Sequence, residues 1–175
     1  MKKLIKFFSY VLVMLSLLIF FLPKINLYYA AEALMKQKNV YISDEEAFDK
    51  GFTLELKHAK VFFDKLALAD VESIRVSPLF FYNVLNIDNI HVNEGFSDFL
   101  PQEVKNVRVE HFIFNPVKVK FRGESEDSHF YGNVNLLKRM LSVHIRLGVI
   151  SEKKYGTMLR KLTKEEGGYL YEYKF

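Results

Sequence analysis

The 175 residues suffice for one membrane anchor and one small domain, and a hydrophobic content of 50% excludes a disordered chain. The absence of cysteine excludes disulfides, thiolate metal sites and cysteine catalysis. Lys2, Lys3 and Lys6 supply three of the net +4 charges, so the rest of the chain is nearly neutral, and we expect no nucleic-acid binding.

The N-terminal segment predicts a single membrane-spanning helix. Residues 7–22 contain no charged side chain, and extending the segment back to Leu4 gives a length close to the roughly 20 residues that span a bilayer. The three lysines precede this segment, so the positive-inside rule places the N-terminus in the cytoplasm. We therefore expect residues 1–24 to anchor the chain in the inner membrane of a Gram-negative bacterium, with the remainder in the periplasm.

A cleaved signal peptide is the alternative interpretation of this segment. Its basic start fits, but small residues suited to cleavage appear at Ala30, Ala31 and Ala33, well beyond the apolar segment. The apolar segment is also longer than a signal peptide requires. The sequence therefore favours an uncleaved anchor.

Residues 25–50 are predicted to form a helical linker. A helix over residues 25–38 would place its apolar side chains on one face, and Pro23 would kink its junction with the anchor. Residues 43–46, with the sequence Ser-Asp-Glu-Glu, have the form of a capping box. They predict the start of a further helical turn.

From Gly51 onward, apolar residues recur at every second position, which is typical of half-buried antiparallel strands. Turn residues separate these segments, and we expect about seven to nine strands in a β-rich domain of residues 51–175. Residues 151–162 have helical spacing instead. They predict a helix with Ser151 as its N-cap.

The expected fold is mainly β: an N-terminal transmembrane helix, then an antiparallel sheet curled into a half-barrel, with one or two short helices. A sheet with one apolar face must cover that face, by curling or by receiving a ligand or partner. An acyl chain or a partner strand would complete the resulting groove. The predicted groove residues are Val61, Phe63, Ile87, Val119, Phe121, Val143 and Ile145.

The sequence contains no catalytic signature. It has neither a Gly-x-Ser-x-Gly elbow nor a phosphate-binding Gly-rich loop. The five histidines are scattered and lack metal-ligand spacing. The acidic residues between Gly123 and Ser128 do not follow a calcium-loop pattern, so we interpret them as a solvated hairpin turn. We expect no catalytic residue, no bound metal and no cofactor.

An aromatic stripe is the most distinctive surface candidate. It comprises Tyr169, Tyr171, Tyr173 and Phe175. We favour a strand whose rings pack on the core, because cross-strand aromatic pairs stabilise sheets. The alternative is an edge strand that adds to a partner sheet.

Weak, widely spaced motifs extend over most of residues 23–175. They are Gly51-Phe52-x-Leu54-x-Leu56, Ile74-x-Val76-Ser77-Pro78-Leu79, Leu85-Asn86-Ile87-x-x-Ile90-x-Val92, Gly132-Asn133-Val134-Asn135-Leu136 and Gly167-Gly168-Tyr169. With these motifs the chain resembles type II secretion system protein N and, more loosely, the AsmA-type proteins. The resemblance implies a non-catalytic inner-membrane protein that assists an outer-membrane secretion machine, with other envelope proteins as partners.

Three functions follow as hypotheses. The first is an assembly component of a type II secretion-like system. The second is a lipid or lipopolysaccharide transport component, similar to LptC or AsmA-type proteins, that holds acyl chains in the apolar groove. The third, a periplasmic hydrolase, is disfavoured because no nucleophile–base pair or paired carboxylates are visible.

Overall fold

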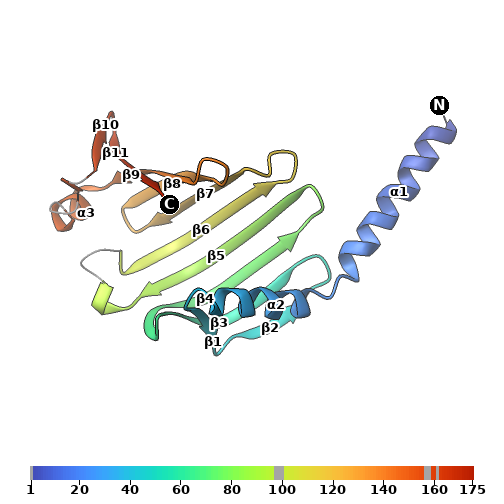
Figure 1. Cartoon of the computed structure of the whole chain (residues 1–175), viewed down its shortest axis with the longest axis horizontal. Helices are drawn as coiled ribbons and strands as arrows, with labels where there is room; N and C mark the ends of the chain where they lie inside the picture. The colour runs from blue at the N-terminus through green and yellow to red at the C-terminus, as the bar shows by residue number, and fades with distance from the viewer. Residues whose placement is uncertain (1, 97–100, 156–158, 161) are drawn as a thin grey trace.

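The structure, a computed structural model, describes residues 2–96, 101–155, 159–160 and 162–175. Two N-terminal helices precede one antiparallel sheet of eleven strands (Figure 1). The helices are α1 (Lys2–Phe20), α2 (Lys24–Lys36), η1 (Glu94–Phe96, 3-10) and α3 (Val149–Lys154). The strands are β1 (Val40–Ser43), β2 (Glu46–Asp49), β3 (Leu54–Phe63), β4 (Leu66–Pro78), β5 (Tyr82–Val92), β6 (Glu103–Phe112), β7 (Lys118–Ser125), β8 (Ser128–Asn135), β9 (Met140–Leu147), β10 (Thr163–Glu165) and β11 (Gly168–Lys174).

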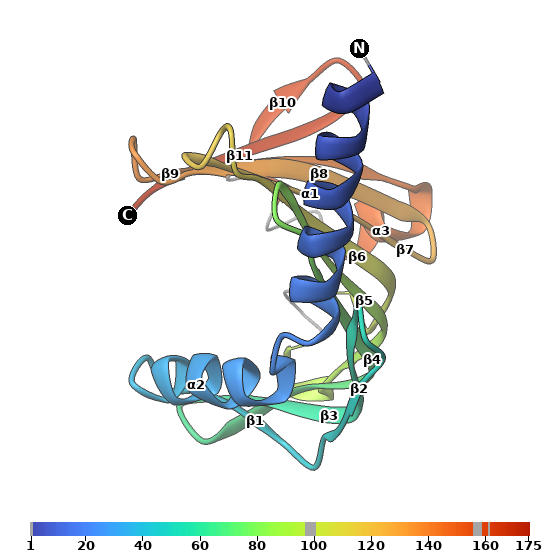
Figure 2. The same ribbon diagram turned by 90° about the vertical axis from the view of Figure 1, so that its right-hand side faces the viewer.

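The strands lie side by side nearly in chain order, from β1 through β3 to β9 and then β11 and β10. The short strand β2 pairs with β3 next to β1. Figure 2 shows α2 beside β1 and β3, with β9–β11 at the other end of the sheet. The mainly β, antiparallel architecture that the alternating pattern predicted is therefore confirmed.

The prediction that the sheet curls into a half-barrel is wrong. The strands form one open sheet rather than a curled one, and β1 and β10 at its two ends are not paired with each other. Part of the reason is that helix α2 covers apolar surface that curling would otherwise have to cover. Tyr28 of α2 lies in the buried core with Leu56 and Ala59 of β3, and Ile25 packs against that core.

The sheet has one apolar and one polar face. Each face can be traced across the strands, because directly paired residues lie on the same face. One row of partners runs Leu56–Ile74–Ile87–Val107 across β3 to β6 and continues through Gly123, Phe130 and Ile145 to Tyr169. On the opposite face, Arg75 forms an ion pair with Asp88 at 2.5 Å, and Arg108 forms one with Glu110 at 2.6 Å. Hydrogen bonds from Arg108 and Tyr82 lower the pKa of the Glu110 carboxyl, so this face stays charged.

Four neighbouring strands share a break in the alternation. The apolar positions step by three residues from Leu56 to Ala59 in β3, and the paired positions in β4, β5 and β6 step likewise. His58 and Asn89 take positive φ angles of 55° and 51° at this level. Strand β7 lacks the extra residue, and the register shifts where β6 meets β7. The step keeps both halves of each strand apolar on the same face.

Two local predictions were wrong, and a third, the hairpin turn, extended over too many residues. Residues 43–46 do not open a helix, because Asp44, at φ 64°, turns the chain between β1 and β2. Ser151 lies inside α3, whose N-cap is Gly148, while residues 156–158 and 161 of the predicted helix lie outside the described residues. The predicted acidic turn is shorter than expected, since β7 continues to Ser125.

Candidate functional site: an apolar cavity and a buried lysine joint

An apolar cavity of about 500 Å³ lies on the apolar face of the sheet. Its size falls within the range of small-molecule sites. Among the described lining residues, only Ser128 and Tyr155 have polar side-chain atoms. The described lining residues are Val61, Leu68, Ala69, Val71, Ile74, Ile87, Ile90, Val92, Pro101, Val104, Val107, Ser128, Phe130, Val143, Ile145, Leu147, Tyr155, Leu159 and Leu162.

Four of the seven predicted groove residues line this cavity: Val61, Ile87, Val143 and Ile145. They come from β3, β5 and β9, so only the strand register brings them together. Phe63 does not line it, and it is 49% exposed beside the β3–β4 turn. Val119 and Phe121 share the apolar face but lie outside the lining.

Two glycines explain the position of the phenylalanine rings beside the cavity. Phe121 is paired with Gly132, and a Cβ added there would lie 2.6 Å from the Phe121 Cζ. Gly123 is likewise paired with Phe130, with a corresponding distance of 2.3 Å. Each ring therefore lies over the glycine of the neighbouring strand, as in other sheets where an aromatic side chain covers a glycine.

A polar cluster fixes α3 at the far end of the cavity. Asp127, in the β7–β8 turn, accepts hydrogen bonds from the Ser151 backbone N–H (3.1 Å) and hydroxyl (2.5 Å). The buried Ser128 hydroxyl donates to the Ser151 hydroxyl at 3.1 Å. These bonds hold the segment that carries Tyr155 and Leu159, which are 8% and 7% exposed, against the sheet. Sequence reasoning missed this cluster because Ser151 lies more than 20 residues along the chain from Asp127 and Ser128.

The aromatic stripe lies on the same apolar face. Tyr169, Tyr171 and Tyr173 of β11 are paired with Ile145, Val143 and Leu141. Strand β10 covers β11 only from Gly168 to Leu170. Within the described part of the chain, no strand pairs with the outer side of residues 171–174. Tyr171 and Tyr173 are 39% and 53% exposed, so this half of β11 is an open edge.

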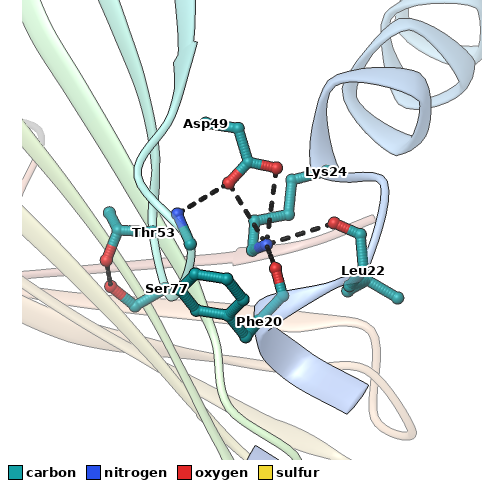
Figure 3. A network of polar contacts seen from close by, with 7 residues as sticks. Phe20, Leu22, Lys24, Asp49, Thr53 and Ser77 are labelled. Carbon is teal, nitrogen blue, oxygen red and sulfur yellow. Dashed lines mark hydrogen bonds and ion pairs between the residues drawn. The ribbon is translucent and has the colours of Figure 1, made fainter. Parts of the chain in front are cut away.

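A buried lysine joins α1 to the sheet, which the sequence did not predict. Lys24 begins α2, and its side chain is 2% exposed. Its ammonium group donates to the backbone carbonyls of Phe20 and Leu22 and lies 3.3 Å from the Asp49 carboxylate of β2 (Figure 3). A cation at this position satisfies carbonyls that the end of α1 leaves free.

An aromatic contact completes this joint. The Phe20 ring lies over Gly51, where an added Cβ would be 2.4 Å from the ring, and meets Phe52 edge-on at 5.6 Å. Gly51 takes φ +81°, and its N–H donates to Asp49 at 2.9 Å. Thr53 then exchanges a hydrogen bond with Ser77 of β4 at 3.1 Å. The C-terminal end of α1 is thus tied to the corner where β3 begins and β4 ends.

Helix α2 is held to the sheet by a second polar contact. The buried Tyr28 hydroxyl donates to Glu45 at 2.8 Å. Burial, followed by this hydrogen bond, raises the pKa of the Tyr28 phenol above its ordinary value, so the phenol is a neutral donor. Together with Lys24, it fixes the first two turns of α2.

Helix α1 has 19 residues and is long and apolar enough to cross a membrane. Lys2, Lys3 and Lys6 lie in its first turns and are exposed. A helix of this length and position is compatible with a membrane anchor and with a signal sequence. The described residues contain no group of three or more His, Asp or Glu side chains that could hold a metal ion.

Comparison with known proteins found no matching protein-family model, no matching curated protein and no matching solved structure.

Proposed function

We propose that this chain is a membrane-anchored, non-enzymatic protein that holds lipid acyl chains on its apolar sheet face. The observation that carries this proposal is the cavity of about 500 Å³, whose lining is almost wholly aliphatic and aromatic. Such a lining favours an apolar ligand, because a polar ligand would lose its hydrogen bonds to water there.

The proposed location is the bacterial inner membrane, with the sheet in the periplasm. This orientation rests on Lys2, Lys3 and Lys6 at the start of α1 and on the positive-inside rule. An anchored sheet would keep its cavity at a fixed distance from the lipids that it receives.

Site-specific photo-crosslinking in cells tests the lipid proposal. A photoreactive residue at Val143, which lines the cavity, is expected to give a lipid adduct, whereas the same residue at Asn133 is not. Asn133 lies on the neighbouring strand and is paired with Ser142, on the polar face. Mass spectrometry of the purified protein would identify the adduct. No lipid at Val143, or equal labelling at both positions, would sink the proposal.

A second candidate is an assembly component of a type II secretion-like system, and the open edge of β11 favours it. An unpaired edge can add a strand from a partner, with main-chain hydrogen bonds providing affinity. Exposed Tyr171 and Tyr173 beside that edge suit a protein contact.

The edge proposal has its own test. In cells that contain such a secretion system, a photoreactive residue at Tyr173 is expected to crosslink to an envelope protein. Tyr131, which is 45% exposed on the polar face, serves as the control position. Deletion of the gene should also reduce secretion. Intact secretion after deletion, together with no protein adduct at Tyr173, would refute this second candidate.

A further inference from the structure

Three turns gather at the end of the sheet to which α1 is tied. They are residues 79–81 between β4 and β5, 113–117 between β6 and β7, and 136–139 between β8 and β9. Backbone hydrogen bonds connect them: the Ile113 N–H donates to the Phe81 carbonyl, and the Leu136 N–H donates to the Val117 carbonyl. The three turns therefore form one continuous edge, which we call the turn edge.

The turn edge exposes large apolar side chains. Phe81 is 52% exposed, Phe114 is 72% exposed and Leu137 is 81% exposed. The rings of Phe81 and Phe114 stack on each other at 5.5 Å, so they form a shared surface rather than scattered contacts. Exposure of this kind at loop tips indicates a surface that is covered in use.

The charges of the two ends of the sheet differ. The turn edge contains no acidic residue, and it carries Lys138 and Arg139. The described turns at the opposite end carry one basic side chain, Lys65, and five acidic ones: Asp64, Glu94, Glu126, Asp127 and Glu166. An anionic surface would therefore attract the turn edge and repel the opposite end.

The position of α1 identifies what covers this edge. Phe20 lies over Gly51, just before β3, and Thr53 bonds to Ser77, just before the first of the three turns. In Figure 1 the turns after β4 and β6 lie on the side of the sheet toward α1. A membrane crossed by α1 would thus have its surface at the level of the turn edge.

From this arrangement we infer that the turn edge docks on the bilayer that α1 crosses. Phe81, Phe114 and Leu137 insert at the boundary between head groups and acyl chains, as apolar side chains of interfacial proteins do, and Lys138 and Arg139 contact anionic head groups. The sheet then stands on the membrane by two attachments, the helix and the turn edge. This inference rests on the anchorage in the proposed function and not on what the cavity holds.

The chain contains no tryptophan, so a single substituted tryptophan reports its own surroundings. The variants are Phe81→Trp and Phe114→Trp at the turn edge, and Phe63→Trp and Glu126→Trp at the opposite end. Phe63 is a matched control for Phe81, since it is the same residue type and 49% exposed. Phe8→Trp in α1 reports on the anchorage itself. Each full-length variant is reconstituted in nanodiscs with and without lipids brominated near the head group.

We expect Phe81→Trp and Phe114→Trp to lose most of their fluorescence with brominated lipid and to emit at shorter wavelength. Glu126→Trp should emit as in water and keep its intensity. As the anionic lipid fraction rises, the quenching of Phe81→Trp and Phe114→Trp should increase, and that of Glu126→Trp should not. If both turn-edge variants behave like Glu126→Trp while Phe8→Trp is quenched, the inference is overturned. If Phe8→Trp is unquenched, the anchorage fails, and the inference fails with it. Quenching of Phe63→Trp alone would indicate lipid near the cavity and would count against docking by the turn edge.

Discussion

Replacing Asp49 with alanine is expected to lower the free energy of unfolding by about 2–4 kcal/mol. The substitution leaves the Lys24 ammonium without its counter-ion although the side chain is 2% exposed. It also removes the acceptor for the Gly51 N–H. The Asp49 side chain is 32% exposed, so solvent screens the pair. The expected loss of free energy of unfolding is therefore smaller than for a fully buried pair.

A double-mutant cycle separates the pair from its surroundings. Lys24→Met removes the buried charge, so the Lys24→Met/Asp49→Ala variant should be less destabilised than the sum of the two single variants. Thermal unfolding of the full-length protein in detergent, followed by circular dichroism, supplies the measurement. Lys60→Ala is the control, since its ion pair with Asp44 is about half exposed on both sides and should contribute about 0–1 kcal/mol. If Asp49→Ala and Lys60→Ala lowered the free energy of unfolding equally, the Lys24–Asp49 pair would contribute no more to stability than a surface ion pair.

Filling the cavity should remove its ligand without unfolding the protein. Val107→Phe adds a ring to the lining, where it occupies space that a bound acyl chain would need, and we expect about a tenfold loss of lipid affinity, or about 1.4 kcal/mol. The cavity of about 500 Å³ has room for the ring, so the midpoint of thermal unfolding should stay constant or rise. The expected result is loss of the lipid adduct at Val143.

A matched control lies two residues along the same strand. Val109 is on the same face of β6 as Val107 but outside the cavity lining. Val109→Phe should therefore leave the adduct at Val143 intact. If Val107→Phe keeps the adduct, or if Val109→Phe loses it equally, the cavity is not where the lipid binds.

The strands from β3 to β9 were predictable because their two faces meet different surroundings. Each buried position in Leu54–Phe63, for example, follows the period-two pattern up to the step at His58. The short strands β1 and β2 were not predictable in this way. Their connecting residues fit a capping box, but Asp44 tolerates a left-handed conformation, and pairing with β3 outweighs the local helical preference.

The candidate site was predictable only in part, because its geometry depends on residues far apart in the chain. Val143 and Ile145 could be assigned to an apolar face from alternation, but alternation does not say where along that face a cavity begins. That depends on α2, which covers the β3 end, and on the segment from α3, which closes the other. The Lys24–Asp49 pair joins residues 25 positions apart, and no local pattern marks it.

The shared three-residue step in β3 to β6 also bears on how the chain avoids mispairing. A sheet built from many similar alternating strands offers each strand several nearly equivalent alignments, and a slip by two residues would keep every apolar side chain on its face. The step removes this degeneracy, since a strand that slips would place its extra residue beside a regular part of its neighbour. His58 and Asn89 therefore mark the level that fixes the register of β3 and β5. Deleting either residue would move the apolar side chains of half of its strand to the polar face.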